Sequence, residues 1–133
     1  MKAHIIHVSG KRKSSVARAT LRPGKGIVRI NHVKLDMLNQ KLPKMKIMEP
    51  LLLAGNASGN VNIDVSVKGG GSMSQAEASR LVIARALSQF DKKLEKTFLE
   101  YDRHLIVADV RRKETRKPNR HGKARSKTQK SYR

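Results

Sequence analysis

The fold of this 133-residue chain is decided by residues 60–90, which read NVNIDVSVKGGGSMSQAEASRLVIARALSQF. In the first part of the stretch apolar and polar side chains alternate strictly, and the apolar ones are Val61, Ile63, Val65 and Val67. A period of two is typical of a strand with one buried face. Three glycines follow at residues 69–71, after which the apolar spacing becomes that of a helix. The stretch therefore predicts a strand, a tight connection and a helix that packs on a sheet.

The helix after the glycines is predicted to begin with a capping box and to have one apolar face. Ser74 with Glu77, or alternatively Ser72 with Gln75, has the spacing that satisfies free amide groups in a first turn. At 100° per residue, one arc of the helix holds Ala76, Val82, Ile83, Ala86, Leu87 and Phe90. Outside the arc lie Glu77, Arg80, Arg85 and Asp91. We expect the apolar arc to pack on the sheet.

Further strands are predicted upstream of this stretch. Residues 15–21 and 27–30 flank Arg22-Pro23-Gly24-Lys25-Gly26, whose proline and glycines favour hairpin geometry. Residues 5–8 are a candidate first strand. In a strand over 15–21, the side chains of Val16, Arg18, Thr20 and Arg22 share one face, and those of Ala17, Ala19 and Leu21 share the other.

The remaining elements are predicted from apolar spacing. Between Leu35 and Ala54 a roughly helical spacing is interrupted by Pro43 and Pro50, which predicts two short helices. Residues 92–101 are a candidate helix, and residues 105–110 are predicted to form a short final strand. The expected fold class is α/β, a single domain over residues 1–110 with a mixed sheet.

Charge divides the chain into this domain and a tail. The chain has 30 Lys and Arg against 10 Asp and Glu, a formal net charge of +20. Residues 1–110 hold 19 basic and 9 acidic side chains, and residues 111–133 hold 11 basic side chains and one acidic, Glu114, so each part carries +10. The only packing groups of the tail are Ala124 and Tyr132. We expect a tail that is disordered until it binds, because it buries too little apolar surface to offset its ordering entropy.

A charge of this size indicates a polyanionic partner, and nucleic acid is the expected one. Membrane binding is disfavoured because the tail has almost no apolar face or aromatic anchor. The chain has no cysteine, and neither a signal peptide nor an apolar run of membrane-spanning length is visible, so a cytoplasmic location is expected. The histidines lie far apart without carboxylates at metal-ligand spacing. We expect no metal, no cofactor, no small-molecule substrate and no catalytic constellation.

Two motifs are candidates for phosphate contacts, each beside a plainer interpretation. Residues 10–15 read GKRKSS, whose three adjacent cations precede a strand face bearing Arg18 and Arg22. The alternative is a solvated loop with ordinary surface arginines. The three glycines before the helix are either a phosphate cradle or a tight connection. Aromatic residues are few, so recognition through phosphate, sugar and helix shape is favoured over the stacking of unpaired bases.

Four segments together resemble one protein family. They are GKRKSSVARA at residues 10–19, RPGKG at 22–26, the glycines with Gln75, Ala78, Arg85, Ala86 and Leu87, and KSYR at 130–133. They match in order the universal S-nine family of small-subunit ribosomal proteins. The resemblance implies no enzymatic activity, a location in the head of the small subunit beside other head proteins, and a fold like the second domain of ribosomal protein S five, with a left-handed βαβ crossover.

The resemblance also implies that the C-terminus penetrates ribosomal RNA and approaches the transfer RNA in the peptidyl site. That role falls on Arg133 and Lys130. Tyr132 stands where bacterial members have Lys, which resembles the archaeal and eukaryotic branch and replaces a phosphate contact by stacking or a hydroxyl hydrogen bond. The expected contacts to ribosomal RNA are Lys11, Arg12, Lys13, Arg18, Arg22, Lys25, Arg111, Arg112, Lys113, Arg116, Lys117, Arg120, Lys123, Arg125 and Lys127; those to transfer RNA are Lys130, Tyr132 and Arg133.

Two other classes of function remain open from the residues alone. An RNA-processing subunit or phosphotransferase would use the glycine loop, although no Mg²⁺ ligand cluster accompanies it. A chromatin-like protein that compacts DNA would share the charge but prefer duplex DNA to structured RNA.

Overall fold

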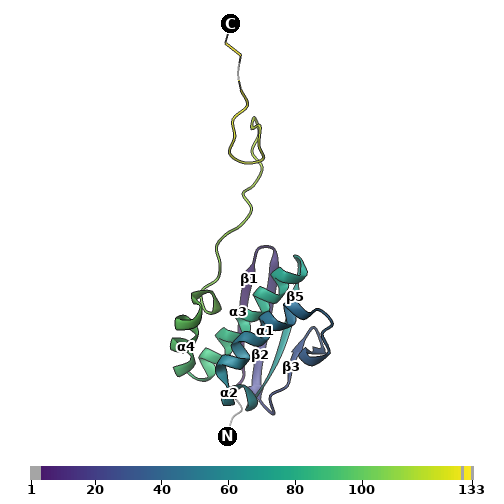
Figure 1. Cartoon of the computed structure of the whole chain (residues 1–133), viewed down its shortest axis with the longest axis vertical. Helices are drawn as coiled ribbons and strands as arrows, with labels where there is room; N and C mark the ends of the chain where they lie inside the picture. Colours follow the sequence, from purple (N-terminus) through teal and green to yellow (C-terminus); the bar gives the residue numbers. More distant parts are fainter. Residues whose placement is uncertain (1–3, 130, 133) are drawn as a thin grey trace.

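The strand and helix predicted from residues 60–90 are present as β5 (Val61–Lys68) and α3 (Ser72–Phe90). The computed structural model describes residues 4–129, 131 and 132. The other strands are β1 (Ile6–Arg12), β2 (Ser15–Pro23), β3 (Val28–Ile30) and β4 (Val33–Lys34). They form a mixed sheet of five strands in the order β1-β2-β5-β3-β4, and α1 (Lys41–Ala54) and α3 cover one of its faces (Figure 1). The predicted α/β class with a mixed sheet is confirmed.

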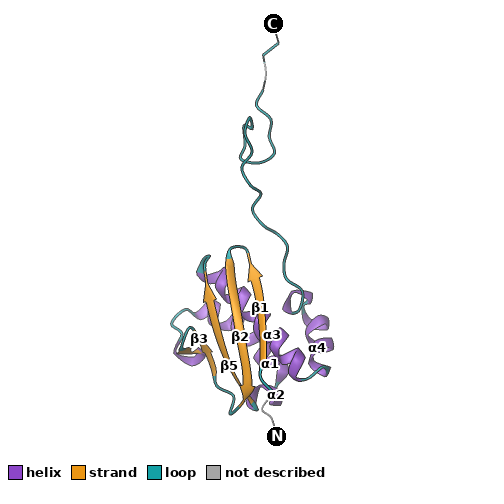
Figure 2. Cartoon of the chain, turned by 180° about the vertical axis from the view of Figure 1, so that it is seen from behind, coloured by secondary structure: helices purple, strands orange, loops and turns teal. Residues whose placement is uncertain are grey.

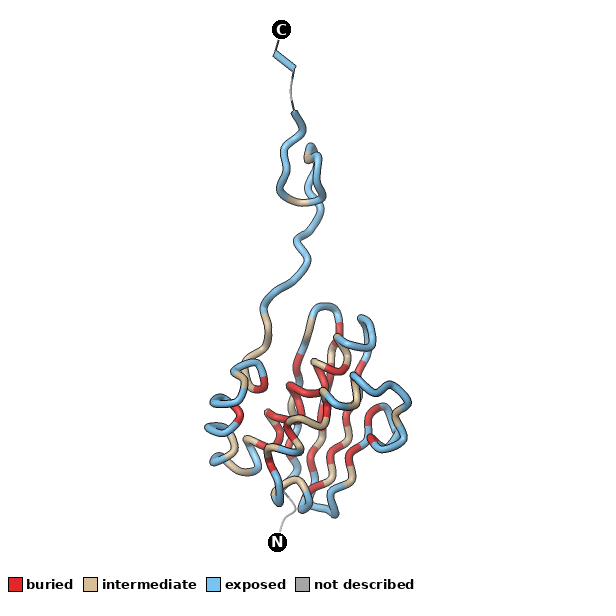
Figure 3. Tube along the Cα trace, viewed as in Figure 1, coloured by how far each residue is buried: buried red, intermediate tan, exposed pale blue. Residues whose placement is uncertain are grey.

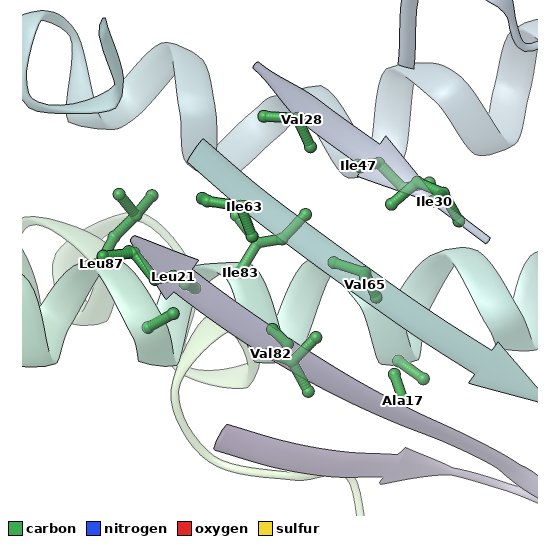
Figure 4. Packing of buried hydrophobic residues seen from close by; sticks show 14 of the residues in the cluster. Ala17, Leu21, Val28, Ile30, Ile47, Ile63, Val65, Val82, Ile83 and Leu87 are labelled. Carbon is green, nitrogen blue, oxygen red and sulfur yellow. The ribbon is translucent and has the colours of Figure 1, made fainter. Parts of the chain in front are cut away.

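The core lies between the sheet and these two helices. Val61, Ile63, Val65 and Val67 of β5 are all buried, as their alternation predicted. From α3 the side chains of Ile83 and Leu87 lie beside Ile63 and Leu21 of the strands (Figure 4), and Val82 packs close to Gly10 of β1. The period-two strand and the apolar arc of the helix therefore pack against each other, with the exception of Phe90 described below.

The hairpin predicted across residues 22–26 is wrong. Strand β5 lies between β2 and β3, antiparallel to β2 and parallel to β3. The amides of the connecting segment bond to the start of β5 instead of closing a turn. The N–H groups of Gly24 and Gly26 donate to the carbonyls of Asn60 and Val61, both at 3.0 Å. The segment thus crosses the end of the central strand, and its proline and glycines serve that crossing.

Besides the two-residue hairpin between β1 and β2, the sheet has a tight hairpin between β3 and β4. Its two loop residues, Asn31 and His32, have φ values of 49° and 69°. Positive φ at both positions is typical of a type I′ turn. The Asn31 side chain also accepts a hydrogen bond from the Val67 N–H at 2.9 Å and donates one to the Val67 carbonyl at 3.1 Å. The turn is thereby fastened to β5.

The two short helices predicted between residues 35 and 54 are one 3₁₀ turn, η1 (Leu35–Met37), and one continuous helix, α1. Pro43 lies in the first turn of α1, where its missing N–H has no intrahelical role. Pro50 lies inside α1 and is buried. Packing of the helix on the core therefore outweighs the hydrogen bond that Pro50 removes. A short helix, α2 (Asn56–Gly59), leads into β5.

The predicted helix over residues 92–101 is confirmed as α4 (Lys93–Tyr101), but the strand over 105–110 is absent from the described chain. A 3₁₀ turn, η2 (Arg103–Leu105), ends at the first of these residues, and the Asp102 carboxylate accepts a hydrogen bond from the His104 N–H of this turn at 3.0 Å. The Ile106 carbonyl accepts a hydrogen bond from Arg85 Nε at 2.8 Å. A side chain of α3 thus uses the acceptor that a neighbouring strand would have paired.

The aromatic anchor of the core also differs from the prediction. Phe90, assigned to the apolar arc, is the last residue of α3 and is 43% exposed. Phe98 of α4 is 0% exposed and is the largest fully buried side chain among the described residues. The buried arc ends before Phe90, which occupies the last position of the helix, and the core is completed from the next helix.

Burial separates the domain from the tail (Figure 3). Among the described residues of 111–132, all are exposed except Arg120 and Ala124, which are half-buried. In the described part of the chain no helix is both long and apolar enough to cross a membrane.

Candidate nucleic-acid interface

The triple glycine lets the start of β2 approach the start of α3. Gly69 and Gly70 have φ values of 80° and 65°, the region that disfavours side chains. A Cβ at Gly69 would lie 2.7 Å from the Ser14 carbonyl oxygen, and one at Gly70 would overlap the Ser15 hydroxyl. That hydroxyl donates to the Gly69 carbonyl at 2.8 Å. These two glycines are explained by a tight connection, and the phosphate cradle stays a prediction.

Neither predicted capping box is present at α3. The N-cap residue is Gly71, and no side chain caps the helix. Gln75 Nε2 instead donates to the Gly69 carbonyl at 3.0 Å. Glu77 accepts a hydrogen bond from Arg12 Nε at 2.7 Å. Both side chains that the spacing assigned to the cap thus make other contacts, Gln75 with the glycine loop before the helix and Glu77 with β1.

Arg12 joins three elements at the base of the tail. Besides its bond to Glu77, its Nη2 lies 3.5 Å from Asp109 Oδ2, and its Nη1 donates to the Arg111 carbonyl at 3.2 Å. The side chain is only 12% exposed. Arg12 was predicted to contact RNA, and that contact stays a prediction. In this structure its charge is already met by two carboxylates, so its observed role is to hold the tail on the domain.

Asp109 and Arg111 form a second ion pair beside Arg12. Arg111 donates to both Asp109 oxygens, through Nε at 3.1 and 3.0 Å and through Nη2 at 2.7 Å. The guanidinium and the backbone N–H of Arg111 hold the pKa of the Asp109 carboxyl well below its usual range. The same hydrogen bond raises the pKa of Arg111. The pair is therefore fully charged at any pH near neutrality.

A strongly basic hollow of about 830 Å³ lies where the tail leaves the domain. We call it the tail-base hollow, and it is lined by Arg12, Lys13, Ser14, Arg111, Arg112 and Lys113. Arg112 Nη1 donates to the Lys13 carbonyl at 3.1 Å, which closes the tail onto the turn between β1 and β2. Segments 99 residues apart thus bring five cations together. Glu77 and Asp109 pair with Arg12 and Arg111, and Lys13, Arg112 and Lys113 have no ion-pair partner among the described residues. This is the arrangement that a chain of phosphates fits.

The second basic surface is the face of the sheet that the helices leave open (Figure 2). As predicted, Arg18 and Arg22 lie exposed on it while Ala17, Ala19 and Leu21 are buried on the other face. The cations that point to this open face from β1, β2, β3 and β5 are Lys11, Arg18, Arg22, Arg29 and Lys68. Asp64 is the one acidic residue in the five strands. It lies 3.8 Å from Arg29, so the face remains strongly positive.

Arg29 and Lys68 were not predicted as contacts, although a signal was available. Each alternates with buried apolar neighbours of its own strand, as Arg18 and Arg22 do. Lys25, which was predicted, is exposed in the crossing segment, where its backbone N–H donates to Asn62 Oδ1 at 2.9 Å.

Two arginines of α3 hold the segment that leads into the tail. Arg80, outside the apolar arc, is nonetheless buried, with Nη2 at 2.6 Å from Glu49 Oε2 and 3.0 Å from Asp102 Oδ2. Burial alone would raise the pKa of Asp102, but hydrogen bonds from the His104 N–H and from Arg80 lower it overall. Arg85 reaches the Ser9 carbonyl at 3.0 Å as well as Ile106. The direction in which the tail leaves is set by these contacts.

The described tail is extended at first and then folds back on itself (Figure 1). Of its predicted RNA-binding cations, Arg116, Lys117, Lys123 and Lys127 are exposed. Arg120 and Arg125 have partners within the tail, described below. Tyr132 is 91% exposed. Lys130 and Arg133, predicted to contact transfer RNA, lie outside the described residues.

Comparisons with known proteins converge on one family. The sequence profile of the family described as "Ribosomal protein S9/S16" matches residues 10–133. The chain is 46% identical over 132 residues to "Small ribosomal subunit protein uS9" of Methanococcus maripaludis (strain C7), covering 97% of this chain and 98% of the relative. It is 47% identical over 131 residues to the protein of the same description from Methanothrix thermoacetophila, with the same shares covered.

Proposed function

The chain belongs to the ribosomal protein S9/S16 family, and from that premise we propose that its domain is anchored to ribosomal RNA in the head of the small subunit while its tail reaches the transfer RNA in the peptidyl site. Membership makes the chain a structural constituent of the small ribosomal subunit and not an enzyme. The phosphotransferase and DNA-compacting alternatives are thereby set aside. The resemblance to the archaeal and eukaryotic branch is confirmed by the archaeal relatives.

The observation that carries the proposal is the tail-base hollow. Three of the five cations that line it, Lys13, Arg112 and Lys113, have no ion-pair partner among the described residues, and a tail rich in exposed cations starts from it. Phosphate contacts release condensed counterions, so closely spaced cations bind a polyanion more strongly than the same cations scattered. The proposal assigns the hollow and the open sheet face to ribosomal RNA, and it divides the chain at residue 110 into an anchoring domain and a reaching tail.

The hand of the crossover and the protein partners are proposed from the resemblance to the family. The connection from β3 to its parallel neighbour β5 passes through α1 and α2, and we assign it the left-handed crossover. Neighbouring head proteins are the third partner, after the two RNAs. The exposed apolar side chains of Met37, Leu42, Met45 and Leu52 around α1 support a protein contact there.

Removal of residues 130–133 should weaken transfer-RNA binding at the peptidyl site without affecting assembly. The buried core of the domain lies between Ile6 and Leu105, so folding and incorporation into small subunits should be nearly unchanged. We expect the loss of transfer-RNA affinity because two of the four removed residues are cations at the end of the tail. Filter binding of transfer RNA to reconstituted subunits measures it, and unchanged affinity would refute the role of the tail end.

Neutralisation of the tail-base hollow should lower the salt dependence of RNA binding. For Lys13→Gln we expect the slope of log K against log salt to decrease in magnitude by about one, the value for one lost phosphate contact. Lys93→Gln on α4 is the matched control, because it removes the same charge from a helix that does not line the hollow. Titrations with structured ribosomal RNA and with duplex DNA at matched salt also test the preference for RNA. Equal slopes of log K against log salt for the two variants would exclude the tail-base hollow as an RNA-binding site.

A further inference from the structure

The tail contains a closed loop in its middle. The Lys117 N–H donates to the Lys123 carbonyl at 3.0 Å, and the His121 N–H donates to the Ser126 carbonyl at 2.7 Å. Arg120 and Lys127 form an antiparallel bridge. Asn119 has a φ of 57°, in the left-handed region where asparagine is among the better tolerated side chains. The fold-back is visible in the distal half of the tail (Figure 1).

An ion pair closes this loop at its base. Arg125 donates to both oxygens of Glu114, through Nε at 2.7 Å and through Nη2 at 3.1 Å. Two parallel bonds of this kind fix the orientation of the pair as well as its distance. These hydrogen bonds lower the pKa of the Glu114 carboxyl and raise that of Arg125. Glu114 is the one acidic residue of the 23 in the tail, and it is used to join the two sides of the loop.

The closed loop gathers cations whose charges are free. Lys113, Arg116 and Lys123 line a hollow beside Glu114. No hydrogen bond or ion pair involves the side chains of Arg116, Lys117, Lys123 or Lys127 among the described residues. Arg120 instead supports the loop, since its Nη1 donates to the Arg125 carbonyl at 3.4 Å. Because Arg125 neutralises Glu114, the hollow presents positive charge to its surroundings.

We propose that residues 114–127, the tail loop, are closed in the free protein and bind closely spaced RNA phosphates as a preformed unit, so that Glu114 strengthens RNA binding despite its negative charge. The inference rests on the proposed RNA binding and adds the device that presents the cations. Binding by a preformed loop avoids the ordering cost that a disordered segment incurs on association. For these residues the proposal replaces the disorder predicted from composition.

The test compares two full-length variants with the same change in net charge. Glu114→Gln opens the loop, whereas Glu95→Gln removes an exposed carboxylate of α4. If the tail were disordered, both variants would bind structured ribosomal RNA more tightly, because each removes one negative charge. With the preformed loop, Glu114→Gln should weaken binding about two- to fivefold at about 0.1 M salt, the range of exposed ion pairs. Glu95→Gln should bind at least as tightly as the unchanged protein.

A charge swap and an RNA-free measurement complete the test. The double variant Glu114→Arg with Arg125→Glu keeps the net charge and should restore affinity. In the free protein, the His121 amide should exchange with solvent more slowly than its counterpart in Glu114→Gln. The proposal of a preformed loop would be overturned if both single variants bound RNA more tightly than the unchanged protein. It would also be overturned if the His121 amide exchanged equally fast in the unchanged protein and in Glu114→Gln. Absence of salt-dependent binding by the unchanged protein would instead overturn the proposed function, so the two failures are distinguishable.

Discussion

Replacement of Phe98 by alanine should lower the free energy of unfolding by about 3–5 kcal/mol, the usual cost of removing a fully buried phenyl ring. The ring is 0% exposed and belongs to the core cluster with Leu87 and Leu105. Its removal leaves a cavity between α4 and the rest of the domain, which a close-packed interior fills only in part. Urea denaturation followed by circular dichroism measures the loss.

The matched control for this prediction is Phe90→Ala. The Phe90 ring is 43% exposed at the end of α3, so its removal should cost about 1 kcal/mol or less. Both variants delete the same atoms, and the difference between them reports burial alone. If Phe90→Ala lowered the free energy of unfolding more than Phe98→Ala, the packing described here would be contradicted. Burial of Phe90 on the apolar arc, as helical periodicity predicts, would then be favoured.

Truncation after Lys113 should have the largest effect on RNA binding. It removes eight cations and Glu114 but retains the ion pairs of Arg12, Asp109 and Arg111 at the base of the tail. The domain should therefore keep its stability. If each cation neutralises one phosphate, the salt slope should fall by about seven and the affinity by more than a hundredfold at about 0.15 M salt.

Salt titrations of the truncated and full-length proteins with the same RNA measure both quantities. Thermal unfolding of the truncated protein serves as the control, since its midpoint should match that of the full chain. A slope that falls by less than about one would show that the tail lies free of phosphate, and the anchoring would then belong to the domain alone.

Local pattern predicted the elements whose burial follows a simple period. β5 alternates because one of its faces packs on α3, and the buried residues of β2 follow the same rule. The pattern was wrong where the outcome depended on where an element begins or ends, or on contacts with residues distant in sequence. Glu77 does not cap α3 because the helix begins at Ser72, which places Glu77 in the second turn, where Arg12 binds it. Residues 105–110 form no strand, and their Ile106 carbonyl accepts a hydrogen bond from Arg85 of α3.

The candidate interface shows the same division. The sequence predicted which side chains are cationic and that Arg18 and Arg22 share a face, because alternation along a strand is local. It did not predict that Arg12 is held by two carboxylates, or that Arg80 is buried beside Glu49 and Asp102. The availability of a cation for phosphate depends on which acidic groups the fold places beside it, and those come from other elements.

By itself, the sequence determined the β5–glycine–α3 unit, the equal division of charge between domain and tail, and the family, because periodicity, composition and motif order need no partner. Only the tertiary structure decided that β5 separates β2 from β3, that Phe98 and not Phe90 completes the core, and that the tail base meets the β1–β2 turn in one hollow. Each of these depends on groups brought together from far apart in the chain, where packing and charge pairing outweigh local preference.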